Sequence, residues 1–275
     1  MKTVAFFVVL SLCITQKILA QDEPKTADEV FFETAVQRFE EEYYAGAAEE
    51  FEAFLTKFPK SPLLGRAHYN LALSHFQLAN YQTAKKLFLQ ILDQPYNEQD
   101  ENSLMEPYTL YKHHSCRILA EIALKEKDYN TAEKYIRMFD KEYPYQHFCG
   151  NEWSAYDMYK AVMQCKVYEG KGETKKAMQV LLPYIFSDAL ASNEEVIREL
   201  FHLLNANFTE EQNRQEFARA LASLEVKEKR KDPTAIIELY GVKVQVIDYF
   251  YDSKTSPREY FQQKVKEHEL FQKFL

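Results

Sequence analysis

The densest group of residues that could do chemistry is a set of nitrogen and sulfur ligands in the middle of the chain. They are His113, His114, Cys116, His147, Cys149 and Cys165. On a helix, His113 and Cys116 would share one face, and zinc accepts imidazole and thiolate ligands. The paired cysteine spacing of zinc modules is missing, so we expect no metal and no cofactor. A Cys–His nucleophile is a weaker hypothesis still, because nothing nearby indicates an orienting group or an oxyanion hole.

Other catalytic motifs are missing from the sequence. Its six glycines include no Gly-x-Gly-x-x-Gly and no Gly-Lys-Ser/Thr arrangement, which argues against nucleotide binding. There is also no Gly-x-Ser-x-Gly elbow and no His-Glu-x-x-His pair. The acidic runs at 40–42 and 49–50 are typical of solvated helix faces rather than of an acid–base pair. We therefore expect a protein that is not an enzyme.

The charge balance argues against a nucleic-acid partner. The chain has 42 Asp and Glu against 34 Lys and Arg, a formal net charge of −8, whereas phosphate binding needs a basic stripe. The one basic cluster, at 227–231, is predicted to lie at a helix end, where cations complement the helix dipole. We expect no nucleic-acid binding.

The first twenty residues have the layout of a secretory signal peptide. Lys2 precedes an apolar run over 4–14, and a plausible cleavage site lies before Gln21. The run is too short to cross a bilayer, which takes roughly 20 residues, and no later stretch comes close. Residues 1–20 thus predict an exported protein without a transmembrane segment. Lipidation of Cys13 and peripheral association with a membrane stay open.

A pattern repeats along the middle of the chain. A leading residue is followed by alanine three positions later and by a large apolar residue seven positions later, starting at Tyr44, Tyr81, Tyr129 and, more weakly, Thr174. The alanine and the apolar residue share one helix face, and the small side chain lets a neighbouring helix approach closely. Each such helix follows another amphipathic segment and a short polar turn. The pattern predicts pairs of antiparallel helices that bury their faces against their neighbours.

These residues resemble the tetratricopeptide repeat (TPR) family. The match is carried best by Leu71-Ala72-x-x-His75 followed by Tyr81-x-x-Ala84-x-x-x-Phe88. It covers residues 28–185, about four helix pairs. With the signal peptide and the segment 51–62, the sequence looks similar to exported TPR proteins of bacterial envelopes, such as outer-membrane assembly lipoproteins and the Tol-Pal-associated periplasmic protein. The resemblance implies an all-α fold, a right-handed superhelical solenoid of antiparallel helix pairs, in the periplasm or at the outer membrane.

Beyond residue 185 the repeat fades, but helix signals continue. Capping residues predict further helices that start after Asn193, Thr209, Asp232 and Ser256. The segment 235–251 is ambiguous, because the valines at 242, 244 and 246 alternate with polar residues as they would in a strand. Its capped start and its helical surroundings favour a helix. We expect residues 193–275 to form helix pairs that cap the solenoid.

In TPR proteins the first helix of each unit lines a concave surface that binds an extended peptide or a partner helix. By this resemblance, the expected partner-binding residues are Arg66, Tyr69, His114, Arg117, Tyr159 and Lys166. Tyrosine and arginine often dominate binding energies. The three cations, set among aromatic rings, favour an acidic or carboxylate-bearing ligand.

Two hypotheses for function follow. The first is a non-enzymatic scaffold or adaptor in the bacterial cell envelope, with a protein partner in the concave groove; the oligomeric state stays open. The second is an accessory component of an uptake system that binds carbohydrate. A contiguous, solvent-facing strip of aromatic residues would favour the second hypothesis, and scattered aromatics with Arg and Lys would favour the first.

Overall fold

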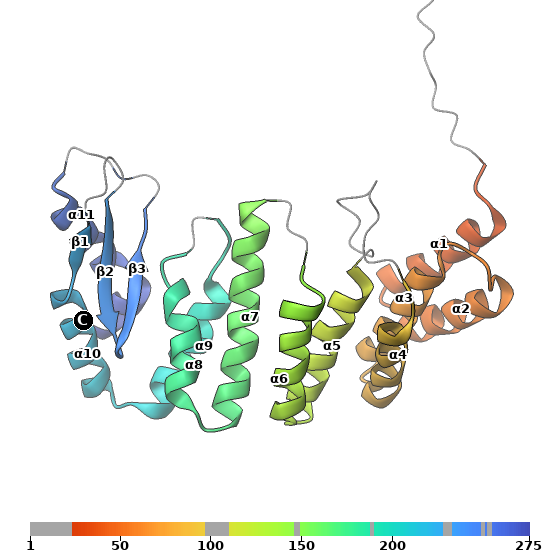
Figure 1. Ribbon diagram of the computed structural model, residues 1–275, viewed down its shortest axis with the longest axis horizontal. Helices are drawn as coiled ribbons and strands as arrows, with labels where there is room; N and C mark the ends of the chain where they lie inside the picture. The colour runs from red at the N-terminus through yellow and green to blue at the C-terminus, as the bar shows by residue number, and fades with distance from the viewer. Residues whose placement is uncertain are drawn as a thin grey trace, which may run out of the picture.

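The computed structural model describes residues 24–96, 110–145, 149–187, 190–227, 233–248, 251 and 255–275. These residues form a mostly helical protein with one small antiparallel sheet near the C-terminus (Figure 1). The predicted signal peptide and its Cys13, as well as His147 and Asp232, lie outside the described residues.

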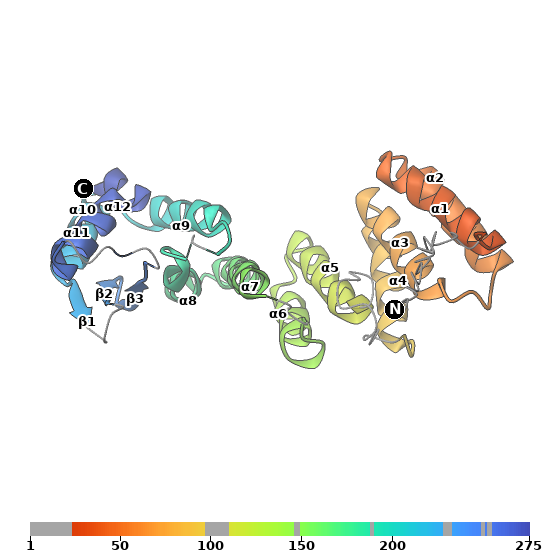
Figure 2. The ribbon, with the colours of Figure 1, turned by 90° about the horizontal axis from the view of Figure 1, so that it is seen from above.

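The first nine α-helices stand side by side in a row (Figure 1), with α6 and α8 on one side of it and α5 and α9 on the other (Figure 2). A π-helical segment, η2 (Met138–Glu142), extends α6, and a 3₁₀ turn, η3 (Leu182–Tyr184), follows α8. The helices are α1 (Ala27–Glu40), α2 (Tyr44–Lys57), α3 (Leu64–Gln77), α4 (Tyr81–Asp93), α5 (Tyr111–Lys125), α6 (Tyr129–Arg137), α7 (Gly150–Gly170), α8 (Thr174–Leu181) and α9 (Glu194–Asn207).

Small residues lie where paired helices meet. The alanines of the repeated pattern are completely buried, as are the small residues at the matching position of each first helix. In the second helices they are Ala47, Ala84, Ala132 and Ala177, and in the first helices Ala35, Ala72, Ala120 and Cys165. The large apolar residues of the pattern are also buried beside them. Packing between consecutive helices is thus consistent with a helical repeat.

The same turn joins the two helices of all four pairs. In each turn one residue is left-handed, with φ between 57° and 73°, and the next residue donates its N–H to a carbonyl five residues back, over 2.8–2.9 Å. The left-handed residues are Glu42, Ala79, Lys127 and Gly172. This is the Schellman arrangement, which satisfies the last carbonyls of the first helix. Only the fourth turn has glycine, the residue that adopts this conformation without steric cost.

Lys127→Gly is expected to stabilise the protein by about 0.5–1 kcal/mol. Left-handed backbone costs an L-residue about 1–2 kcal/mol, more than the roughly 0.5–1 kcal/mol that the flexibility of glycine costs in the unfolded chain. Urea unfolding followed by circular dichroism measures the change. The matched control is Lys86→Gly at an exposed site inside α4, which should destabilise by about 0.5–1 kcal/mol. Equal effects of the two glycines would contradict the argument.

Buried apolar residues form three clusters along the row, and two helices link them. The first cluster spans α1 to α3, the second α3 to α7, and the third α7 to the C-terminus. Helix α3 places Leu71 in the first cluster and Ala72 in the second. Helix α7 places Val167 in the second and Cys165 in the third. Neighbouring units are therefore held together through shared helices.

The C-terminal part corrects the prediction of helix pairs over residues 193–275, and with it the all-α class. After α9 and α10 (Glu210–Ala222), three strands form a sheet in the order β1-β2-β3, and α11 (Pro257–Glu267) and α12 (Glu269–Phe274) follow. The strands are β1 (Glu225–Lys227), β2 (Thr234–Leu239) and β3 (Val242–Val246). Lys227 accordingly ends a strand and not a helix. The favoured helix over 235–251 is wrong, because β2 and β3 occupy most of it.

The alternating valines were the correct signal. Val244 and Val246 are completely buried, whereas Lys243 and Gln245 are exposed. Only a strand, whose side chains alternate between its two faces, places both valines in the core and both polar side chains in solvent. Tyr240 and Gly241, with φ of 50° and 75°, form the two-residue turn between β2 and β3. Two such residues are the mark of a tight hairpin. The sheet packs on α10, where Asn213 accepts a hydrogen bond from the Tyr240 hydroxyl.

Candidate partner-binding face

The six residues predicted to bind a partner occupy equivalent positions on α3, α5 and α7. Counted back from the left-handed turn residue of each pair, Arg66, His114 and Tyr159 stand thirteen residues before it. Tyr69 and Arg117 stand ten residues before it, and Lys166 stands six before it. Positions three or four residues apart lie on one face of a helix. All six therefore lie on the same face of their respective helices.

Three of the six come together in one pocket, which we call the α5–α7 pocket. Its volume is about 350 Å³, at the small end of the range for ligand sites. It is lined by His114, Arg117, Tyr145, Glu152, Ala155, Tyr156 and Tyr159. Four of these side chains are aromatic rings, and they come from α5, from the segment after η2 and from α7. The pocket thus lies between two helix pairs.

Arg117 and Tyr159 form the centre of the pocket. The guanidinium carbon of Arg117 lies 4.1 Å from the centroid of the Tyr159 ring, a close cation–π contact. The Tyr159 hydroxyl donates a hydrogen bond to Glu121 Oε1 over 3.0 Å. Burial raises the pKa of Tyr159 to about 12, although the Arg117 cation opposes the rise. The phenol is therefore neutral, and both side chains are held in place before any ligand arrives.

A second pair of rings forms another wall. Tyr145 and Tyr156 stack with centroids 6.1 Å apart and planes 19° apart. The Tyr156 hydroxyl donates to the carbonyl of Phe139 over 3.2 Å, and Phe139 belongs to η2. Burial, and secondarily the charge of Asp140, raises the pKa of Tyr156 to about 12. The π-helical segment thus positions this wall of the pocket.

Aromatic contacts continue from the pocket towards α3. Neighbouring ring centroids are 5.8–6.3 Å apart along the whole series. In order from the pocket, the rings are Tyr145, His114, Tyr69, Tyr111, Tyr96 and His68. Tyr69 is buried, at 9% exposure, and the others are half-buried. A ring that contacts its neighbours in this way is fixed in orientation, so the edge of the row is rigid and aromatic.

Sequence reasoning missed the tyrosines at 96, 111, 145 and 156. A signal was present for two of them, since Pro95-Tyr96 and Pro144-Tyr145 occur at equivalent places, just after the second helix of a unit. The tyrosine that follows the proline in both places is the signal that could have identified them. Nothing in the sequence indicates the π-helical segment that carries the acceptor for Tyr156.

The structure does not bring the three predicted cations together. Arg66 lines a separate cavity of about 800 Å³ beside α1, together with three glutamates and the apolar side chains of Phe32 and Val36. Lys166 pairs with Glu195 and Glu199 of α9 over 3.5 and 3.3 Å. Arg117 shares its pocket with Glu152, so each cation has at least one carboxylate in its surroundings and this face is not a basic groove. An acidic ligand is therefore not favoured by the charges.

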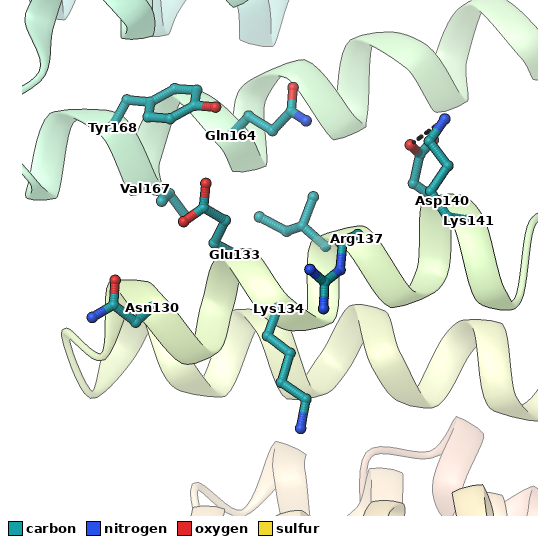
Figure 3. A pocket seen from close by; sticks show the side chains of 10 residues that line it. Asn130, Glu133, Lys134, Arg137, Asp140, Lys141, Gln164, Val167 and Tyr168 are labelled. Carbon is teal, nitrogen blue, oxygen red and sulfur yellow. Dashed lines mark ion pairs between the residues drawn. The ribbon is translucent and has the colours of Figure 1, made fainter.

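A charged groove lies on the other face of α7 (Figure 3). It has a volume of about 420 Å³ and is lined by α6, η2 and α7, with Gln164 and Tyr168 about half a helical turn away from Tyr159. Its two carboxylates are paired with lysines. Asp140 contacts Lys141 over 3.0 Å and Lys160 over 2.9 Å, and Glu133 contacts Lys171 over 2.5 Å. Substitutions in this groove therefore provide a control for substitutions in the α5–α7 pocket.

Three of the nitrogen and sulfur residues, His113, Cys116 and Cys165, are buried in the helical core. His113 is buried, and its Nδ1 donates to the Tyr143 carbonyl over 2.8 Å. Cys116 and Cys165 are buried, Cys149 is exposed, and burial raises the pKa of Cys165 to about 12. Among the described residues, no group of three or more His, Cys, Asp or Glu side chains is placed to hold a metal ion.

Comparisons with known proteins do not assign a family. No protein-family model matches the chain, and a search of curated proteins finds no match. In the part of the chain that the structure describes, no helix has the length and apolar character that a membrane span requires.

Stability is expected to fall as the pH rises from about 10 to 12, and Tyr159→Phe should reduce the slope. The folded protein holds the protons of Tyr156 and Tyr159 up to about pH 12, whereas a phenol in the unfolded chain loses its proton near pH 10. The unfolded state is therefore favoured progressively above pH 10. Urea unfolding at pH 9, 10 and 11 measures the slope. Identical slopes for the native chain and Tyr159→Phe would contradict the assignment.

Proposed function

We propose that the protein is a non-enzymatic scaffold that docks a partner peptide or helix on the face formed by α3, α5 and α7. The observation that carries the proposal is the α5–α7 pocket, where His114, Arg117 and Tyr159 from two helix pairs converge. Rings and a guanidinium held in place by their neighbours are the groups that most often supply binding energy at protein interfaces. The preformed geometry lowers the entropic cost of binding.

The proposal includes a TPR-like solenoid in an exported protein of the bacterial envelope. Support for the solenoid comes from the four equivalent turns and from the small residues buried at matching positions. Support for export comes from the apolar run and cleavage site near the N-terminus. Such an array presents a long face, along which several side chains of one partner can bind in succession.

A second candidate is carbohydrate binding, as an accessory to an uptake system. The observation that favours it is the unbroken series of ring contacts from His68 to Tyr156. Sugar rings stack on such surfaces. The mixture of Arg117 and Glu152 in the pocket would serve either ligand.

In an in-cell cross-linking pull-down with tagged protein, the double variant Arg117→Ala/Tyr145→Ala should capture at least tenfold less partner protein than the native chain. Truncating anchors in a preformed pocket typically costs more than 1 kcal/mol each. The matched control is Arg137→Ala/Tyr168→Ala, which removes the same two residue types from the groove on the opposite face. Circular dichroism checks that both variants fold.

The outcomes separate the hypotheses. Loss of captured proteins in the pocket variant alone supports docking at this face. Equal capture by the native chain and both variants would put the interface elsewhere. Capture of no protein, together with binding of an oligosaccharide from a glycan array, would replace the scaffold proposal by the carbohydrate candidate.

A further inference from the structure

We infer that the α5–α7 pocket receives an aromatic side chain of the partner, and not a carboxylate or a cation. The inference rests on the proposed function, because it names the group of the partner chain that this pocket selects. The pocket is the place on the binding face where several predicted residues and several additional rings meet.

The charges of the pocket disfavour a charged occupant. Of the lining residues only Arg117 and Glu152 carry formal charges, and these are opposite in sign. Arg117 lies against the Tyr159 ring, and Glu152 accepts a hydrogen bond from the backbone N–H of Cys149 over 3.3 Å. A carboxylate that entered would be attracted by Arg117 but repelled by Glu152, and a cation would meet the reverse, so neither gains on balance. A neutral occupant avoids both repulsions.

The walls favour a flat occupant. Tyr145 and Tyr156 form one stacked pair, and Arg117 and Tyr159 form another. An inserted ring can stack on or meet the edge of the tyrosines, and it can lie against the guanidinium, which prefers a ring face. An aliphatic side chain would bury a similar apolar surface area but would make none of these directional contacts. The volume of about 350 Å³ accommodates a large aromatic side chain with its backbone outside.

An alanine in the pocket lining and a nearby tryptophan allow the occupancy of the pocket to be tested. Ala155 lines the pocket and is itself exposed, so Ala155→Phe fills the space without removing any packing contact. Ala53 is an exposed alanine within α2, and Ala53→Phe is the matched control. Trp153 is the one tryptophan of the sequence, is 58% exposed and lies next to Glu152 on α7. Trp153 is not itself in the lining, but it stands three residues from Tyr156 on the same helix. We therefore expect its fluorescence to respond when the pocket is filled, and it is the only tryptophan in both variants.

The experiment is selection of phage-displayed random 12-residue peptides on the purified full-length chain, followed by titration of the enriched peptides. We expect these peptides to share a Phe, Tyr or Trp. Replacing that residue by Leu should weaken binding at least tenfold, and Ala155→Phe should weaken it to the same extent, whereas Ala53→Phe should not. Phe-containing peptides should also shift the emission of Trp153.

Three results would overturn the inference. If enriched peptides bind but share a carboxylate or a cation, and tolerate aromatic-to-Leu replacement, the pocket selects charge and only this inference fails. If their binding is indifferent to Ala155→Phe, the partner docks outside the pocket and again only this inference fails. If no peptide is enriched but chitotriose or maltotriose quenches Trp153, and Ala155→Phe abolishes the quenching, both the inference and the scaffold proposal fail.

Discussion

The close approach of helices at small residues is the contact on which the rest of the structure depends. A pair of helices has no interior of its own, so its stability comes from the faces it shares with its neighbours. Completely buried alanines such as Ala84 and Ala120 allow that approach, and large side chains such as Phe88 fill the space beside them. Because packing uses this face of each first helix, the adjacent face remains available for recognition.

The repeat could be predicted from the sequence because its signals are local. Alanine and a large apolar residue four apart identify a helix face, and a short polar segment identifies a turn. The sheet was missed because two local signals conflicted: a capped start indicated a helix, and alternating valines indicated a strand. The structure favours the valines, since burial of Val244 and Val246 against the C-terminal core decides the outcome. Strand formation depends on such tertiary context more than helix formation does.

The lining of the α5–α7 pocket was predictable in part for the same reason. His114, Arg117 and Tyr159 were found because equivalent helix positions share a face. Tyr145 and Tyr156 were not, since one follows a second helix and the other depends on the π-helical segment for its hydrogen-bond acceptor. The structure does not bring the three predicted cations together. Arg66 and Lys166 lie at other junctions of the row, each beside carboxylates.

The position of the pocket between two helix pairs means that an occupant would affect how firmly these pairs are held together. Its walls come from α5, from the segment after η2 and from α7, and α7 is the helix that belongs to both the second and the third apolar cluster. In an array where each unit contacts only its neighbours, an occupant at this junction adds to one nearest-neighbour contact and leaves the others unchanged. Binding there should therefore stiffen the contact between the third and fourth helix pairs, while α1 and α2, which lie in the first cluster, keep their stability.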